Sequence, residues 1–156
     1  MPPEADAVMT LSERIESAMR DAMRARHEQR TQTLRMAMAA AHNDKIARGR
    51  DLTDEEVVDV LTRQVKQRRE SIAMYRDAGR EERAMAEEAE AAILAEFLPQ
   101  QLTEHEVESL ARAAVAETGA ASPSDLGRVM GQLSPQTKGR ADGRLVSEVV
   151  RRLLAG

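Results

Sequence analysis

Apolar residues recur every three or four positions along nearly the whole chain, which is the spacing of one face of an α-helix. No run alternates apolar and polar positions with the β-branched and aromatic residues that are typical of a strand. The pattern therefore predicts an all-α fold. The first predicted helix covers about residues 10–26. A turn at 27–29 separates it from a second helix that ends near residue 48. The remaining predicted helices cover about residues 54–78, 81–97, 104–118, 123–133 and 142–154.

Local signals mark where these helices begin and end. A hydroxyl residue followed three positions later by an acid is the pattern of a capping box, and it occurs at Thr10, Thr53, Thr103 and Ser122. Glycines stand where three helices should stop, as left-handed caps, at Gly49, Gly79 and Gly119. We expect one inward-facing apolar face on each of the first four helices. The members of these faces are Leu11, Ile15, Ala18, Met19, Ala22, Met23, Leu34, Ala37, Met38, Ala41, Ile46, Val57, Leu61, Val65, Ile72, Tyr75, Ala86, Ala89, Ile93, Leu94 and Phe97.

Pro99 is the clearest boundary in the chain, because proline disfavours helix at the preceding residue and cannot continue a helix itself. Residues 1–98 are predicted to form an elongated N-terminal helical bundle, of which 1–9 are disordered. Residues 99–156 are predicted to form a small three-helix C-terminal domain, in which Asp142 caps the last helix.

The composition narrows the class of protein. Charged residues are 32% and hydrophobic residues 42% of the 156, a globular balance, and the absence of cysteine excludes disulfides and thiolate chemistry. The first residues lack the pattern of a signal peptide, and no apolar run approaches the roughly 20 residues of a membrane span. We expect a cytoplasmic protein that makes no membrane contact.

Charge is distributed unevenly along the chain. Residues 81–118 contain ten acids and two bases, whereas residues 123–156 contain six bases and three acids. The C-terminal region of this acidic protein is therefore locally basic, and local fields govern the attraction of an anionic partner more than net charge does.

The stretch 127–144 combines four glycines with four basic residues, and the helical spacing of apolar residues is interrupted there. Glycine turns expose backbone N–H groups, and neighbouring cations add charge, so this stretch is the predicted anion-binding site. Its candidate RNA-binding residues are Gly127, Arg128, Lys138, Gly139, Arg140 and Arg144. The alternative is a helix connection that carries solvated arginines.

Arg63, Lys66 and Gln67 form a second candidate patch, because their spacing places them on one helix face. The alternative here is a solvated face that pairs with acids of the neighbouring acidic helix at residues 81–97.

Candidate catalytic chemistry is sparse. The three histidines lack the spacing of metal ligands within a helix, no phosphate-binding loop follows a strand, and no cofactor motif occurs, so we expect no metal, no cofactor and no autonomous enzyme. One Phe, one Tyr and no Trp exclude an aromatic platform that stacks single-stranded bases. What remains is recognition of shape and phosphate, which suits a folded RNA such as tRNA.

Several segments together resemble the GatB/YqeY family, specifically its stand-alone YqeY-like proteins. They are Thr33-Leu34-Arg35-Met36, Leu52–Val57, Lys66–Ile72, Tyr75–Arg80, Phe97-Leu98-Pro99-Gln100-Gln101-Leu102 and Lys138-Gly139-Arg140-Ala141-Asp142-Gly143-Arg144-Leu145-Val146. The resemblance extends over about residues 10–154.

The resemblance implies a C-terminal domain similar to the tail of the B subunit of tRNA-dependent amidotransferase, which is associated with gripping tRNA. It implies tRNA, and amidotransferase or tRNA-synthetase components, as partners, and it associates the chain by relatedness alone with carbon–nitrogen ligases that use glutamine as amido-N-donor. The matching positions are Gly127, Val129, Met130, Lys138, Gly139, Arg140, Ala141 and Arg144, while Asp142-Gly143 follows the YqeY-like form. The alternative function is a helical protein-interaction adaptor with no RNA role.

Overall fold

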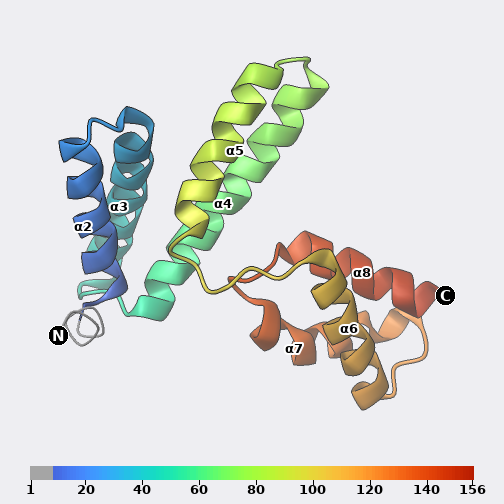
Figure 1. Cartoon of the computed structure of the whole chain (residues 1–156). Coiled ribbons are helices and arrows are strands. Elements are labelled where there is room, and N and C mark those ends of the chain that lie inside the picture. Colours follow the sequence, from blue (N-terminus) through green and yellow to red (C-terminus); the bar gives the residue numbers. More distant parts are fainter. Residues whose placement is uncertain (1–8) are drawn as a thin grey trace. The chain divides into compact units, whose positions relative to one another are not determined.

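The computed structural model describes residues 9–156 and is all-α in that range, with seven α-helices, one 3₁₀ turn and no strand (Figure 1). The predicted fold class is therefore confirmed for these residues. Of the segment 1–9 that was predicted to be disordered, residues 1–8 lie outside the described range.

The helices in chain order are α2 (Leu11–Arg24), α3 (Glu28–Arg48), α4 (Asp54–Asp77), α5 (Glu81–Ala95), α6 (Glu104–Thr118), the 3₁₀ turn η1 (Pro123–Asp125), α7 (Leu126–Thr137) and α8 (Gly143–Ala155). The chain divides into two compact units, residues 1–98 and 99–156.

The first unit contains α2 to α5, in which α2 packs against α3, and α4 packs along α5 (Figure 1). Its core forms where the apolar faces of these helices meet. The buried members of that core are Leu11, Ile15, Leu34, Ala37, Val57, Leu61, Val65 and Leu94. Small and branched aliphatic side chains fill this core, since the unit has a single Phe and a single Tyr, both only partly buried.

The second unit packs α6, α7 and α8 around a separate core. Its buried members are Val107, Ala111, Ala114, Val129, Leu133, Val146, Val149, Val150 and Leu154. Each helix contributes residues spaced three or four positions apart, so one apolar face of every helix is directed inward.

Capping hydrogen bonds explain why α2, α4 and α6 begin where they do. In each, the threonine hydroxyl oxygen accepts the backbone N–H of the glutamate three residues on, and that carboxylate accepts the threonine N–H. The boxes predicted at Thr10, Thr53 and Thr103 are therefore complete. At Ser122 the carboxylate of Asp125 accepts the Ser122 N–H at 3.2 Å.

Two groups of sequence-based expectations were wrong. The helix predicted over 123–133 begins as a 3₁₀ turn and then continues as α7 through Pro135 to Thr137. Burial of Leu133 and Thr137 one turn apart favours continuation, and the exposed proline costs one hydrogen bond in the last turn.

The predicted inward faces also need correction. Met23 and Ile46 are 50% and 65% exposed, and on α5 Ala84 is buried while Ala86, which was expected to face inward, is exposed. An acidic, alanine-rich helix has little apolar contrast between its faces, so its periodicity does not identify the buried face.

Candidate nucleic-acid interface

The turn between α7 and α8 positions four of the six candidate RNA-binding residues. Helix α7 ends at Thr137, whose carbonyl accepts the N–H groups of Arg140 at 2.8 Å and Ala141 at 3.0 Å. Gly139 has φ 74°, a left-handed conformation that a residue with a Cβ adopts at a cost. Helix α8 then begins at Gly143 with Asp142 as its N-cap, as predicted.

A strap, residues 99–102, lies against this turn and holds it. The Leu102 N–H donates to the Arg140 carbonyl at 2.8 Å. The Gln101 side-chain amide donates to the carbonyls of Gly139 and Pro99, each at 2.8 Å. The turn is thus paired with a segment about 40 residues earlier in the sequence.

Arg140 is part of that pairing. Its Nε donates to the Gln100 carbonyl at 3.1 Å and its Nη1 donates to the Gln136 carbonyl at 3.2 Å. Carbonyls are neutral acceptors, so these hydrogen bonds bring no negative charge to offset that of the guanidinium. Its field also contributes to the lowered pKa of Glu106, which is due first to the backbone and side chain of Thr103.

Lys138 and Arg144 flank Arg140 on the two sides of the turn, and both are exposed. Lys138 is the C-cap of α7, and Arg144 lies in the first turn of α8. Within residues 9–156 the Arg144 side chain has no hydrogen bond and no ion pair. Its backbone N–H donates to Asp142 Oδ1 at 3.0 Å, so Asp142 occupies one of the N–H groups that an anion at the helix end would use.

The other two candidates lie elsewhere. Gly127 and Arg128 belong to the first turn of α7, and Arg128 Nη2 pairs with Asp125 Oδ1 at 3.1 Å. Ten helical positions separate Arg128 from Lys138, which is a rise of about 15 Å. The structure therefore brings together Lys138, Gly139, Arg140 and Arg144, and places Gly127 and Arg128 apart from them.

The second candidate patch lies on α4 of the first unit. Lys66 and Gln67 are exposed, and Arg63 Nη2 lies 3.8 Å from Asp44 Oδ2 on α3. The alternative interpretation paired this patch with acids of the helix predicted at 81–97, but Arg63 pairs with α3. Arg68, which is not part of the patch, contacts that acidic helix, α5.

Arg68 was assigned to no site from the sequence, yet it is among the most buried charged residues. Its Nη1 donates to Gln64 Oε1 at 3.1 Å, and its Nη2 lies 3.7 Å from Glu90 Oε1. Burial, and next the Glu87 carboxylate, raise the pKa of Glu90. The contact joins α4 to α5 across 22 sequence positions, and no local pattern signals it.

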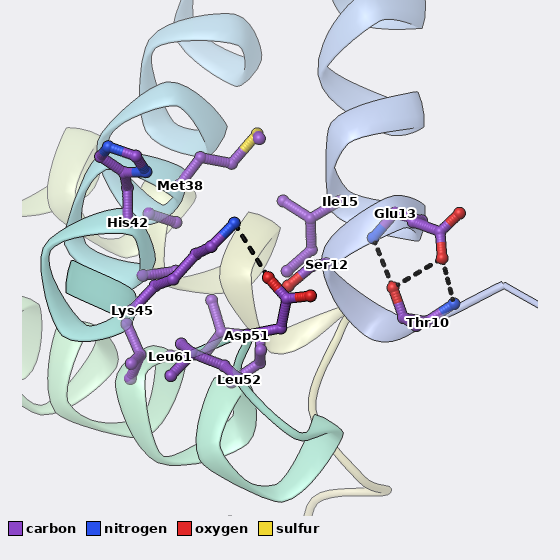
Figure 2. Close-up of a pocket in the computed structure, with 14 residues that line it drawn as sticks. Thr10, Ser12, Glu13, Ile15, Met38, His42, Lys45, Asp51, Leu52 and Leu61 are labelled. Carbon is purple, nitrogen blue, oxygen red and sulfur yellow. Dashed lines mark hydrogen bonds and ion pairs between the residues drawn. The ribbon is translucent and has the colours of Figure 1, made fainter. Parts of the chain in front are cut away.

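The first unit also contains a pocket of about 330 Å³ between α2, α3 and the start of α4 (Figure 2). Its apolar wall includes Ile15, Ala37 and Leu61. Figure 2 shows two pairings among its polar groups: Lys45 Nζ lies 2.9 Å from Asp51 Oδ1, and Thr10 and Glu13 form the capping box. The sequence signal for this space is weak, since small alanines on α3 are also common in close helix packing.

The part of the chain that the structure describes contains no group of three or more His, Asp or Glu side chains arranged to hold a metal ion. Across residues 9–156, no helix has the length and apolar character that crossing a bilayer requires.

These observations define the class of protein: the described residues form an all-helical protein with two compact units, and the second unit carries a basic turn. Residues 12–154 match the family profile described as Yqey-like protein, so the chain belongs to the YqeY-like family. No curated protein matches the chain.

Proposed function

We propose that this protein is a tRNA-binding accessory module, related to the tail of the amidotransferase B subunit, and that it performs no chemistry alone. On this proposal an N-terminal helical bundle precedes a three-helix RNA-binding domain, and the protein acts in the cytoplasm with amidotransferase or tRNA-synthetase components. Membership of the YqeY-like family supports the relationship to that tail. A ligase activity that uses glutamine as amido-N-donor would belong to the whole assembly.

The observation that carries the proposal is the charge at the α7–α8 turn. Lys138, Arg140 and Arg144 lie within seven residues, and Arg140 is bound by carbonyls rather than by a carboxylate. The three cations outnumber the nearby acids, Asp142 and Glu106, so a local positive field remains on an acidic protein, and such a field attracts phosphate. The described chain has no aromatic platform, so RNA shape and backbone are the features that this surface can recognise.

The test is a gel-shift or filter-binding titration of tRNA at two salt concentrations. Each phosphate contact releases condensed counterions, so the affinity should fall steeply between about 50 and 200 mM salt. Changing Lys138, Arg140 and Arg144 together to Ala should weaken binding and flatten the salt dependence. If the wild type has no affinity for tRNA at low salt, the proposed function is wrong; if the triple variant binds equally well, only the surface is wrong.

A protein-interaction adaptor is the second candidate, and two exposed methionines favour it. Met74 near the end of α4 and Met85 on α5 are 71% and 58% exposed. Flexible, polarisable methionine side chains suit contact with another protein. Affinity capture from lysate with and without nuclease separates the two functions, because partners that persist after RNA is destroyed favour the adaptor.

A further inference from the structure

Two segments that are 40 residues apart in sequence form one structural unit at the candidate interface. The strap, residues 99–102, and the α7–α8 turn are joined by hydrogen bonds from Leu102, Gln101 and Arg140. We propose that Arg140 and Gln101 are positioning residues, which hold the turn so that Lys138 and Arg144 meet RNA phosphates. This inference rests on the proposed function, and it removes Arg140 from the direct contacts.

The guanidinium of Arg140 connects two separate segments. Nε reaches the Gln100 carbonyl in the strap at 3.1 Å, and Nη1 reaches the Gln136 carbonyl in the last turn of α7 at 3.2 Å. A planar group with donors in fixed directions can satisfy both carbonyls at once, whereas a lysine ammonium on its flexible stem offers a single point of charge. The arrangement therefore depends on the shape of the arginine and not only on its charge.

Gln101 has the same connecting role without charge. Its amide nitrogen carries two hydrogens, and it donates to Pro99 and Gly139, both at 2.8 Å. Gly139 is buried and adopts the left-handed conformation, so its carbonyl direction is set by the turn itself. Gln101 thus ties the strap to the residue directly before Arg140.

The strap is in turn fixed by the core of the second unit. Leu102 packs against that core, and its N–H donates to the Arg140 carbonyl at 2.8 Å. Lys138 and Arg144 stand two residues before and four residues after Arg140, so a turn held on its strap side presents both cations from a fixed backbone. Preorganisation of this kind strengthens binding, because less ordering remains to be done when RNA arrives.

The competing role for Arg140 is a direct phosphate contact, and a charge-conserving substitution distinguishes the two. We would measure tRNA affinity at three salt concentrations for wild type and for Arg140→Lys, Arg140→Ala and Gln101→Met. Amide hydrogen exchange at Leu102 reports whether the strap remains paired, and a thermal melt confirms that each variant is folded.

If Arg140 and Gln101 position the turn, Arg140→Lys should weaken binding nearly as much as Arg140→Ala, by about 3- to 10-fold, the size of one or two lost hydrogen bonds. Gln101→Met should do the same although it removes no charge. In all three variants the slope of log affinity against log salt should stay within about half a unit of wild type, and Leu102 should exchange about tenfold faster.

A different pattern would overturn the assignment. Near-wild-type binding by Arg140→Lys, together with a slope reduced by about 0.9 in Arg140→Ala, would make Arg140 a phosphate ligand. Unchanged Leu102 exchange in all variants would show that the side chains do not hold the strap. If the wild type fails to bind tRNA, the proposed function is wrong, and so is the proposed role of Arg140 and Gln101 in binding. Amide exchange at Leu102 still decides whether these two side chains hold the strap. If Arg140→Ala does not melt cooperatively, Gln101→Met decides the outcome.

Discussion

The α3–α4 and α7–α8 junctions share a short sequence and differ in their charge. Each has a glycine in the left-handed conformation, Gly49 with φ 72° and Gly139 with φ 74°, followed directly by an arginine. In the first junction Arg50 donates from Nη1 and Nη2 to the Glu56 carboxylate at 2.7 and 2.9 Å, and Arg48 also contacts Glu56. In the second, Arg140 donates only to carbonyls.

The difference arises from the residue that follows the helix cap by three positions. In α4 that position is Glu56, the acid of the capping box, and it neutralises the arginines before it. In α8 the N-cap is Asp142 and the third position is Leu145, so no carboxylate at that position reaches back to the turn. A glycine–arginine turn is therefore not an anion site in itself. Whether it is cationic depends on the first turn of the next helix.

Charge reversal should produce the largest effect and test the contrast directly. We expect Lys138→Glu combined with Arg144→Glu to weaken tRNA binding by about 100-fold, because each reversal replaces an attraction of up to about 1 kcal/mol with a repulsion of similar size. Filter binding at low salt measures it. The matched control is Arg63→Glu with Lys66→Glu on α4, which makes the same change in net charge.

The control should change affinity by no more than about threefold, the effect of net charge alone through screening solvent. Equal losses of affinity in the two double variants would mean that tRNA binding depends on the overall charge of the protein and that the α7–α8 turn is not the binding surface. A larger loss from the α4 variant would move the binding surface to the first unit.

The α2–α3 junction extends the comparison, because it has an arginine where the other junctions have glycine. Arg26 has φ 59°, and the His27 N–H donates to the Ala22 carbonyl at 2.9 Å, which is the bonding of a left-handed C-cap. A residue with a Cβ is strained there, so Arg26→Gly should stabilise the protein by about 1 kcal/mol. Urea denaturation followed by circular dichroism measures the change.

Arg26→Ala separates backbone strain from loss of the arginine side chain. It removes the charge and the long stem but keeps the Cβ, so it should leave the free energy of unfolding within about 0.5 kcal/mol of wild type. If Ala stabilises as much as Gly does, the backbone conformation is not the cause.

The junctions also show how much of this molecule could be predicted from its sequence. Capping boxes such as Thr53–Glu56 were predictable because both partners lie within one helical turn, and the all-α class followed from the apolar period. The concentration of glycine and basic residues at 127–144 also indicated the α7–α8 turn. Gly127 and Arg128 lie in α7, where a helix over 123–133 was predicted.

Contacts between distant residues were not predictable. The hydrogen bond from Arg140 to Gln100 joins positions 40 apart, and Arg68 meets Glu90 across two helices. Residue type and spacing do not distinguish an arginine that donates to a carbonyl from one that donates to a carboxylate or to water. The partner depends on packing, which a periodic pattern does not specify.

A smaller effect on RNA affinity should come from the one acid within the basic turn. Asp142→Asn keeps an oxygen that can accept the Arg144 N–H, since asparagine caps helices as well as aspartate does, but it removes the negative charge. We expect tRNA binding to tighten by about threefold at low salt, and the gain to vanish near 0.5 M salt as screening increases. The same titration measures it, with a thermal melt as the control for folding; weaker binding by a folded variant would show that the Asp142 carboxylate itself orients the site.

The smallest effect concerns pH, and it should distinguish the neutralised junction from the cationic one. Arg50 first, and then the Thr53 N–H, lower the pKa of Glu56 from 4.5 to about 2. A lowered pKa means that the unfolded chain binds the proton more tightly, so the stability that Glu56 contributes is complete above about pH 4.5 and is lost as pH falls through about 2. Glu56→Gln keeps a capping side chain but does not titrate, so in urea melts between pH 6 and pH 3 the advantage of wild type over this variant should shrink as pH falls. An advantage that is constant over that range would show that hydrogen bonding, and not the charge of Glu56, holds Arg50 at the α3–α4 junction.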